Sequence, residues 1–100
     1  SWGGDKENEK QKNITGVGMP INPYLWKATL ETLNFMPLSS TDPFAGTIIT
    51  DWYTTASNLG ERCKLNIFIN GKDLKTNNLK VLSFCQTLKK NQWVNVPSKN

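Results

Sequence analysis

The sequence predicts an α+β fold in which one N-terminal helix packs on an antiparallel meander of about four strands. The first indication is an apolar stripe at helical spacing that follows Asn22-Pro23. The second is an alternation of apolar and polar residues over residues 62–70, in which Phe68 is the one apolar residue at a polar position. The chain has 100 residues, of which 37% are hydrophobic, and this fits one domain with a modest core.

The first part of the chain is expected to lie outside that domain. Residues 5–13 are polar, carry balanced charge and lack an apolar period, as is typical of a solvated linker. We therefore expect a flexible tail over residues 1–20. The single domain should span residues 21–97, and residues 98–100 form the C-terminal end.

The helix is predicted over residues 23–36. Asn22 is a good N-cap because its side chain can accept hydrogen bonds from free backbone amides. Pro23 suits the first helical position, where its missing N–H costs nothing. Pro37 should end the helix. The apolar stripe that would face the sheet contains Trp26, Leu30 and Leu33.

The strands are expected after a short extended piece at residues 38–40. They are predicted at residues 47–53, 62–70, 79–88 and 93–96. In the first of them, β-branched and aromatic residues dominate, and Ile48, Thr50 and Trp52 should share one face, with Trp52 in the core. Residues 54–60 are expected to form a loop and 89–92 a turn.

One register considered for the two central strands has Ile69 facing Leu79. The other pairs on the helix side would then be Ile67 with Val81, Leu65 with Ser83, and Cys63 with Cys85. A disulfide between the two cysteines is one outcome of this register. Two reduced thiols in a slightly shifted register are the favoured alternative, and both are left open.

The opposite face of these strands would be too apolar to lie comfortably in water. A single helix covers a single face, so a partner, a second copy or another segment should cover this one. The candidate partner surface consists of Lys64, Phe68, Lys80, Leu82, Phe84 and Leu88.

The residue types argue against an enzyme and against a cofactor. The chain contains no histidine, which removes the commonest general base and metal ligand. Its two cysteines lack the spacing of a zinc or thioredoxin-like motif. The candidate carboxylates, which are scattered with no predicted pairing, are Asp42, Asp51, Glu61 and Asp73.

Charge is distributed unevenly along the chain. Residues 1–61 carry four lysines and seven acids, whereas residues 62–100 carry eight bases and one acid. Lysines and phenylalanines on one sheet face are chemically similar to a surface that binds single-stranded nucleic acid. The aromatic signature of the common RNA-binding sheet is absent, so nucleic acid is the least favoured partner.

Residues 22–38 read NPYLWKATLETLNFMPL, and residues 42–53 read DPFAGTIITDWY. Together they resemble an envelope lipoprotein family of unknown function, of alphaproteobacterial type. They are also distantly similar to the helix-grip modules of lipoprotein C of the outer-membrane β-barrel assembly machine. The resemblance implies a periplasmic scaffold, a helix-grip-like fold that lacks its C-terminal helix here, and a lipid anchor upstream of this sequence. It transfers no catalytic or binding residue.

The main functional expectation is a non-catalytic, outer-membrane-associated module that binds another envelope protein or a second copy of itself. One alternative is a carrier of a small ligand or lipid in the groove between helix and sheet. The other is single-stranded nucleic-acid binding. The apolar runs are strand-sized, so no transmembrane segment is expected.

Overall fold

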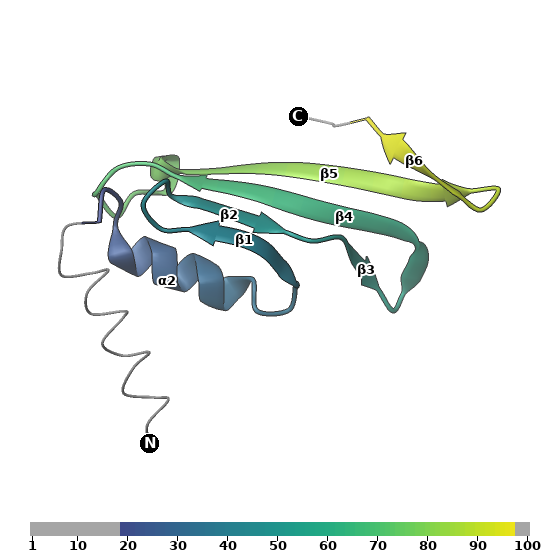
Figure 1. The fold of residues 1–100 in the computed structure, drawn as a ribbon, viewed down its shortest axis with the longest axis horizontal. Coiled ribbons are helices and arrows are strands. Elements are labelled where there is room, and N and C mark those ends of the chain that lie inside the picture. The colour runs from purple at the N-terminus through teal and green to yellow at the C-terminus, as the bar shows by residue number, and fades with distance from the viewer. Residues whose placement is uncertain (1–18, 98–100) are drawn as a thin grey trace, which may run out of the picture.

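The computed structural model describes residues 19–97 as a sheet with one α-helix on one of its faces (Figure 1). The sheet has six strands in the order β1-β2-β4-β5-β6, and β3 pairs with β4 beyond the end of β2. Every strand pairing is antiparallel. In chain order the elements are α2 (Pro23–Thr32), β1 (Leu38–Asp42), β2 (Thr47–Thr50), β3 (Tyr53–Thr55), β4 (Asn58–Ile69), a 3-10 turn (Thr76–Asn78), β5 (Leu79–Lys89) and β6 (Gln92–Val96).

The predicted α+β, helix-grip-like class with about four strands is therefore wrong. About 51% of the described residues lie in strands, and the single α-helix has 10 residues. The protein is a mostly β structure because polar segments that lack an alternating pattern still extend the sheet. The expected tail falls, up to residue 18, outside the described residues, and so does the expected C-terminal end at 98–100.

The helix begins where the sequence predicts and ends one turn earlier. The Asn22 Oδ1 accepts hydrogen bonds from the amides of Tyr24 (2.9 Å) and Leu25 (3.0 Å). At the other end, Leu33 has left the helical conformation, with ψ near 10°. Asn34 favours helix weakly, and a residue before proline is biased away from helix, so the predicted continuation to Met36 is not formed.

Two strands arise where the sequence suggested an extended piece and a loop. The predicted piece at 38–40 is part of β1, which runs on to Asp42 and pairs with β2. The predicted strand at 47–53 is split into β2 and β3, and the expected loop at 54–60 contains the end of β3 and the first residues of β4. Backbone pairing needs no apolar side chain, which is why hydrophobic alternation missed these residues.

The long hairpin of β4 and β5 has the register in which Ile69 faces Leu79, and the favoured shifted register is wrong. Ile69 pairs with Leu79, Ile67 with Val81, Leu65 with Ser83 and Cys63 with Cys85. The chain then reverses through Lys90 and Asn91, both with positive φ, and β6 pairs with the end of β5 (Figure 1). Two adjacent positive-φ residues are typical of a tight hairpin turn that matches strand twist.

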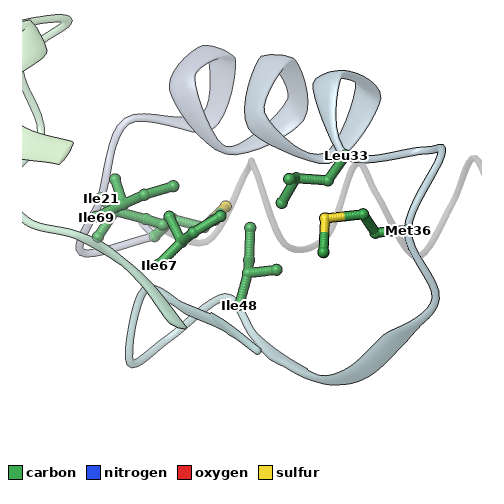
Figure 2. Packing of buried hydrophobic residues seen from close by; sticks show 7 residues of the cluster. Ile21, Leu33, Met36, Ile48, Ile67 and Ile69 are labelled. Carbon is green, nitrogen blue, oxygen red and sulfur yellow. The ribbon is translucent and has the colours of Figure 1, made fainter. Parts of the chain in front are cut away.

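The core lies between α2 and the sheet, near the loop that joins β4 and β5 (Figure 2). Ile48 and Ile69 are 0% and 1% exposed and form its centre. Trp26 packs against this cluster from the helix, as predicted. The buried hydrophobic residues of this core are Met19, Ile21, Leu33, Met36, Ile48, Ile67 and Ile69.

Candidate functional site

The sheet has two faces with different surroundings. Odd-numbered residues of β4, such as Leu65 and Ile67, point toward α2 on what we call the helix face. Even-numbered residues point the other way, onto the reverse face, because side chains alternate along a strand. Phe68 and Phe84 lie on the reverse face, as the sequence analysis expected.

The six residues predicted as a partner surface occupy the reverse face but do not form one compact cluster. Cross-strand pairs join Phe68 to Lys80 at one end of the hairpin and Lys64 to Phe84 near its middle. Phe84 is 43% exposed and Leu88 is 41% exposed, whereas Phe68 and Leu82 are half-buried. The two lysines are therefore separated along the hairpin, each beside a different phenylalanine.

Trp52 does not lie in the core, and the prediction that it shares a face with Ile48 and Thr50 is wrong. Its ring lies beside the side chains of Arg62 and Lys64, which project from the reverse face. The reason is that residues 51 and 52 are outside the regular strands, so the alternation of β2 does not continue through them. Half-buried, Trp52 instead covers part of the reverse face.

The reverse face carries a group that we call the cation–aromatic cluster, formed by Trp52, Arg62, Lys64, Phe84 and Trp93. The Arg62 guanidinium carbon lies 4.5 Å from the Trp52 ring centroid and 4.3 Å from that of Trp93. The Lys64 ammonium lies 5.0 Å from the Trp52 centroid and 5.9 Å from that of Phe84. Cations at such distances are attracted by the negative face of an aromatic ring.

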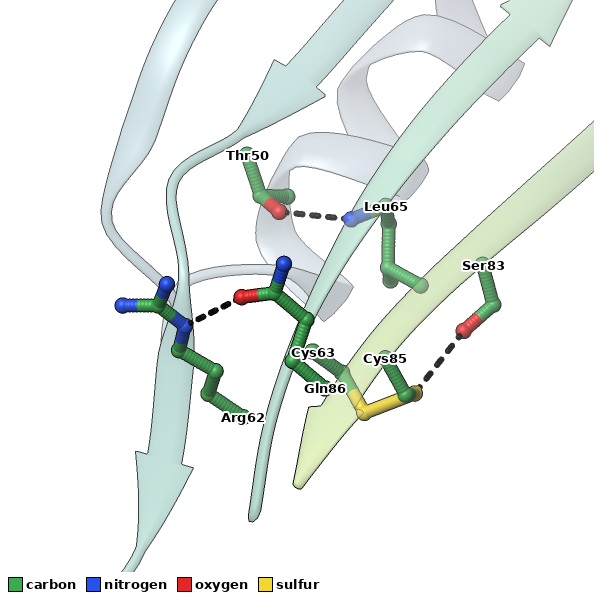
Figure 3. The surroundings of a disulfide bond; sticks show 7 residues. All are labelled: Thr50, Arg62, Cys63, Leu65, Ser83, Cys85 and Gln86. Carbon is green, nitrogen blue, oxygen red and sulfur yellow. Dashed lines mark hydrogen bonds between the residues drawn. A yellow bond between two sulfur atoms is a disulfide. The ribbon is translucent and has the colours of Figure 1, made fainter. Parts of the chain in front are cut away.

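Hydrogen bonds across three strands orient Arg62 in this cluster. Its Nε donates to Gln86 Oε1 at 2.8 Å, a bond visible in Figure 3. Gln86 Nε2 in turn donates to Asn95 Oδ1 at 2.8 Å. These hydrogen bonds link Arg62 in β4 to Gln86 in β5 and Gln86 to Asn95 in β6. They hold the guanidinium in place relative to β6, the strand that carries Trp93.

Arg62 and Lys64 form no ion pair with a carboxylate in the described part of the chain. Among residues 19–97, the one ion pair joins Lys75 to Asp73 at 3.6 Å, and both side chains are well exposed. Within the same residues, the hydrogen bond of Arg62 uses Nε and leaves its two Nη groups without an acceptor. Within the described residues, the cluster thus holds two cations that no ion pair neutralises.

A second candidate site is an apolar groove of about 320 Å³ between α2 and the hairpin. Val81, which contributes to its edge, is 46% exposed. The volume of this groove is just above ~300 Å³, the lower end for pockets that hold small ligands. Its lining consists of Leu25, Ala28, Thr29, Thr32, Leu33, Leu65, Ile67, Leu79 and Val81.

Cys63 and Cys85 are joined by a disulfide on the helix face of the hairpin (Figure 3). Their Cα atoms are 4.1 Å apart. Cys63 and Cys85 lie directly opposite each other on β4 and β5. The alternative with two reduced thiols in a shifted register is therefore wrong. The bond links the two longest strands near the end to which β3 and β6 are attached.

The candidate carboxylates have structural contacts. Asp42 Oδ1 accepts from the amides of Phe44 (3.0 Å) and Ala45 (3.1 Å), and Asp51 Oδ1 accepts from the Trp52 amide at 2.8 Å. Over residues 19–97, no group of three or more metal-ligating side chains gathers. The same residues include no helix long and apolar enough to cross a membrane.

Sequence reasoning missed Arg62, Trp93 and the position of Trp52. For the first two a signal was available. Arg62 has the same strand parity as Lys64, and a two-residue turn at Lys90-Asn91 pairs Trp93 with Leu88 on the reverse face. No comparable periodicity marks Trp52, because it follows the end of β2.

A curated relative is similar over most of this chain. It is "Uncharacterized protein RP420" of Rickettsia prowazekii (strain Madrid E), which is 42% identical over 85 residues. The match covers 85% of this chain and 51% of the relative, so the chain spans about half the relative's length. No solved structure matches this chain.

A protein-family model described as "Domain of unknown function (DUF3576)" matches residues 19–100. The predicted resemblance to a family of unknown function is thus confirmed, whereas the envelope-lipoprotein character and the likeness to lipoprotein C are not part of this finding. With most of its length matched, the chain belongs to the DUF3576 family.

Proposed function

We propose that this chain is a non-catalytic binding or assembly module of the bacterial periplasm, associated with the outer membrane, that binds another envelope protein. The observation that carries the proposal is the reverse face, where exposed apolar side chains adjoin Arg62 and Lys64, two cations without an ion pair among residues 19–97. An exposed apolar patch with a charged border is typical of a protein-interaction surface. The binding surface includes Phe84 and Leu88.

The disulfide supports the assignment to the periplasm. Disulfides such as Cys63–Cys85 persist in oxidising compartments and are rare in the reducing cytosol. The envelope-lipoprotein resemblance adds a membrane anchor upstream of this sequence to the proposal. The non-catalytic role is supported by Asp42 and Asp51, whose carboxylates bind backbone amides of their own turns.

Photocrosslinking in the organism that encodes the protein tests this proposal. A benzoylphenylalanine at Phe84, followed by irradiation and cell fractionation, should give an adduct with one envelope protein. The same group at Tyr24, which is 73% exposed on the helix, is the matched control and should give none. Equal labelling at both positions, or recovery of the protein in the cytosol, would contradict the proposal.

A second candidate function, a carrier of an apolar ligand, is supported by the groove of about 320 Å³. Radiolabelled palmitate should co-purify with the protein and be reduced at least about fivefold by Val81→Asp, since a charge would be placed on the apolar lining. Val94→Asp is the control, because Val94 is similarly exposed at 40% and does not line the groove. Equal retention by both variants would remove this candidate.

Single-stranded nucleic-acid binding receives less support from the geometry. Phe68 is half-buried opposite Lys80, away from Phe84 opposite Lys64, so the two rings expected to stack on bases do not form one platform.

A further inference from the structure

The guanidinium of Arg62 lies against two aromatic rings that come from opposite sides of β4. Trp52 precedes β3, on one side of β4, and Trp93 belongs to β6, on the other side. The Nε of Arg62 is occupied by Gln86 Oε1. The two Nη groups remain as donors, in the planar fork that matches a carboxylate with two parallel hydrogen bonds.

We infer that Arg62, assisted by Lys64, is the binding site for a carboxylate on an acidic segment of the protein partner. The inference rests on the proposed function and names the chemistry that the partner must present. Charge complementarity is its main support. Arg62 and Lys64 form no ion pair among residues 19–97, so an incoming carboxylate displaces no ion pair described there.

Preorganisation makes Arg62 a better ligand site than an ordinary surface arginine. A free arginine side chain loses much conformational freedom when it binds, and this loss weakens exposed ion pairs. The Trp52 and Trp93 rings and the Gln86–Asn95 bond already restrict Arg62. The entropic cost of binding a carboxylate is correspondingly smaller.

The surroundings favour an acidic peptide over other anionic ligands. Phe84 lies directly across from Lys64 on the neighbouring strand and remains 43% exposed, and Leu88 is 41% exposed. Neighbouring strands are about 5 Å apart, so one ligand can contact a cation and an apolar side chain together. An extended peptide with an acidic and an apolar residue two positions apart offers both groups on one face, about 7 Å from each other.

Fluorescence anisotropy with two labelled peptides tests the inference. One probe is a fluorescein-labelled octapeptide in which Glu and Leu take turns at every second position with Ser between them, and its matched control replaces every Glu by Gln. The Glu peptide should bind in low salt, at least about tenfold more tightly than the Gln peptide, because charge-assisted hydrogen bonds are lost with Gln. Equal binding of the two peptides would overturn the inference.

Variants separate the fork geometry of Arg62 from its charge. Arg62→Met should weaken binding of the Glu peptide about tenfold, and Arg62→Lys, which keeps the charge and loses the fork, about fivefold. Lys64→Met provides a second test should Arg62 variants prove unstable by circular dichroism, and should weaken binding severalfold. Lys27→Met removes the same charge from the exposed side of α2 and should bind as the wild type does. Unchanged binding by folded Arg62 variants contradicts the inference.

Competing ligands complete the experiment. A twelve-nucleotide oligo-dT and phosphatidylglycerol vesicles should each bind more weakly than the Glu peptide, and tighter Arg62-dependent binding of either overturns the inference. The proposed function can fail separately. A Phe84 crosslink that survives Arg62→Met supports protein binding and contradicts the carboxylate site, whereas Arg62-dependent peptide binding without any cellular crosslink supports the site alone.

Discussion

The guanidinium carbon of Arg62 lies 4.3 Å from the ring centroid of Trp93, although β5 separates the two strands that carry them. This contact and the bond between Gln86 and Asn95 attach β6 to the rest of the sheet through side chains. Strand β6 pairs only with the last part of β5, from Cys85 to Lys89. The stability of this end of the sheet should therefore depend on Arg62.

Arg62→Met should lower the free energy of unfolding by about 1–2 kcal/mol, because it removes two cation–aromatic contacts and one hydrogen bond. Lys64→Met is the control and should cost less than about 1 kcal/mol, since its ring distances of 5.0 and 5.9 Å are longer. Urea denaturation followed by tryptophan fluorescence measures both. A greater loss for the Lys64 variant would contradict this account.

The disulfide should contribute substantially to stability. Replacing Cys63 and Cys85 together by serine should lower the free energy of unfolding by about 2–4 kcal/mol, because the open chain gains conformational freedom when unfolded. Urea melts with and without dithiothreitol check the cause. The reductant should destabilise the wild type and leave the double variant unchanged, and no effect on the wild type would show that the bond does not form.

Gly46 is required by its backbone conformation and by a close approach to β4. Its φ is +72°, and a Cβ there would collide with the Ile69 carbonyl. Gly46→Ala should therefore cost about 2–4 kcal/mol in a chemical melt. Gly60→Ala, where the nearest atom would lie 3.5 Å away and φ is not positive, should cost less than about 1 kcal/mol. Similar losses in both variants would argue against strain at Gly46.

Asn22 links the start of the helix to the loop after β4. Its side-chain oxygen caps α2, while its Nδ2 donates to the Lys72 carbonyl at 2.9 Å. Asn22→Ala should cost about 1–2 kcal/mol, and Asn22→Asp, which keeps the capping oxygen, should cost about half of that or less. Differential scanning calorimetry distinguishes the two. Equal losses would mean that the bond to Lys72, not the cap, dominates.

Elements with a local physical cause were predictable. The cap at Asn22 needs only a side-chain acceptor next to free amides, and alternation along β4 places Leu65, Ile67 and Ile69 on one face. The end of the helix was overestimated, because Met36 is buried by the core from a non-helical turn. An apolar residue at helical spacing does not show by itself that the backbone is helical.

The candidate site was predictable only in part. Lys64 and Phe84 were placed on the reverse face by strand parity, and the structure brings them together as a cross-strand pair. Lys80 was placed on the same face but lies beside Phe68, away from the cluster. The contribution of Trp52 depends on the irregular residues between β2 and β3, which no periodicity describes.

The amino-acid sequence by itself determined where α2 begins and which residues of the hairpin face the helix, while it left open whether Cys63 and Cys85 meet across two strands. Those features depend on local hydrogen bonding and on alternation, both of which are written in neighbouring residues. Only the tertiary structure decided that the fold is mostly β and that Trp52 and Trp93 both lie against Arg62. The reason is physical: these outcomes depend on which strand lies beside which, and three-strand contacts join residues that no short pattern connects.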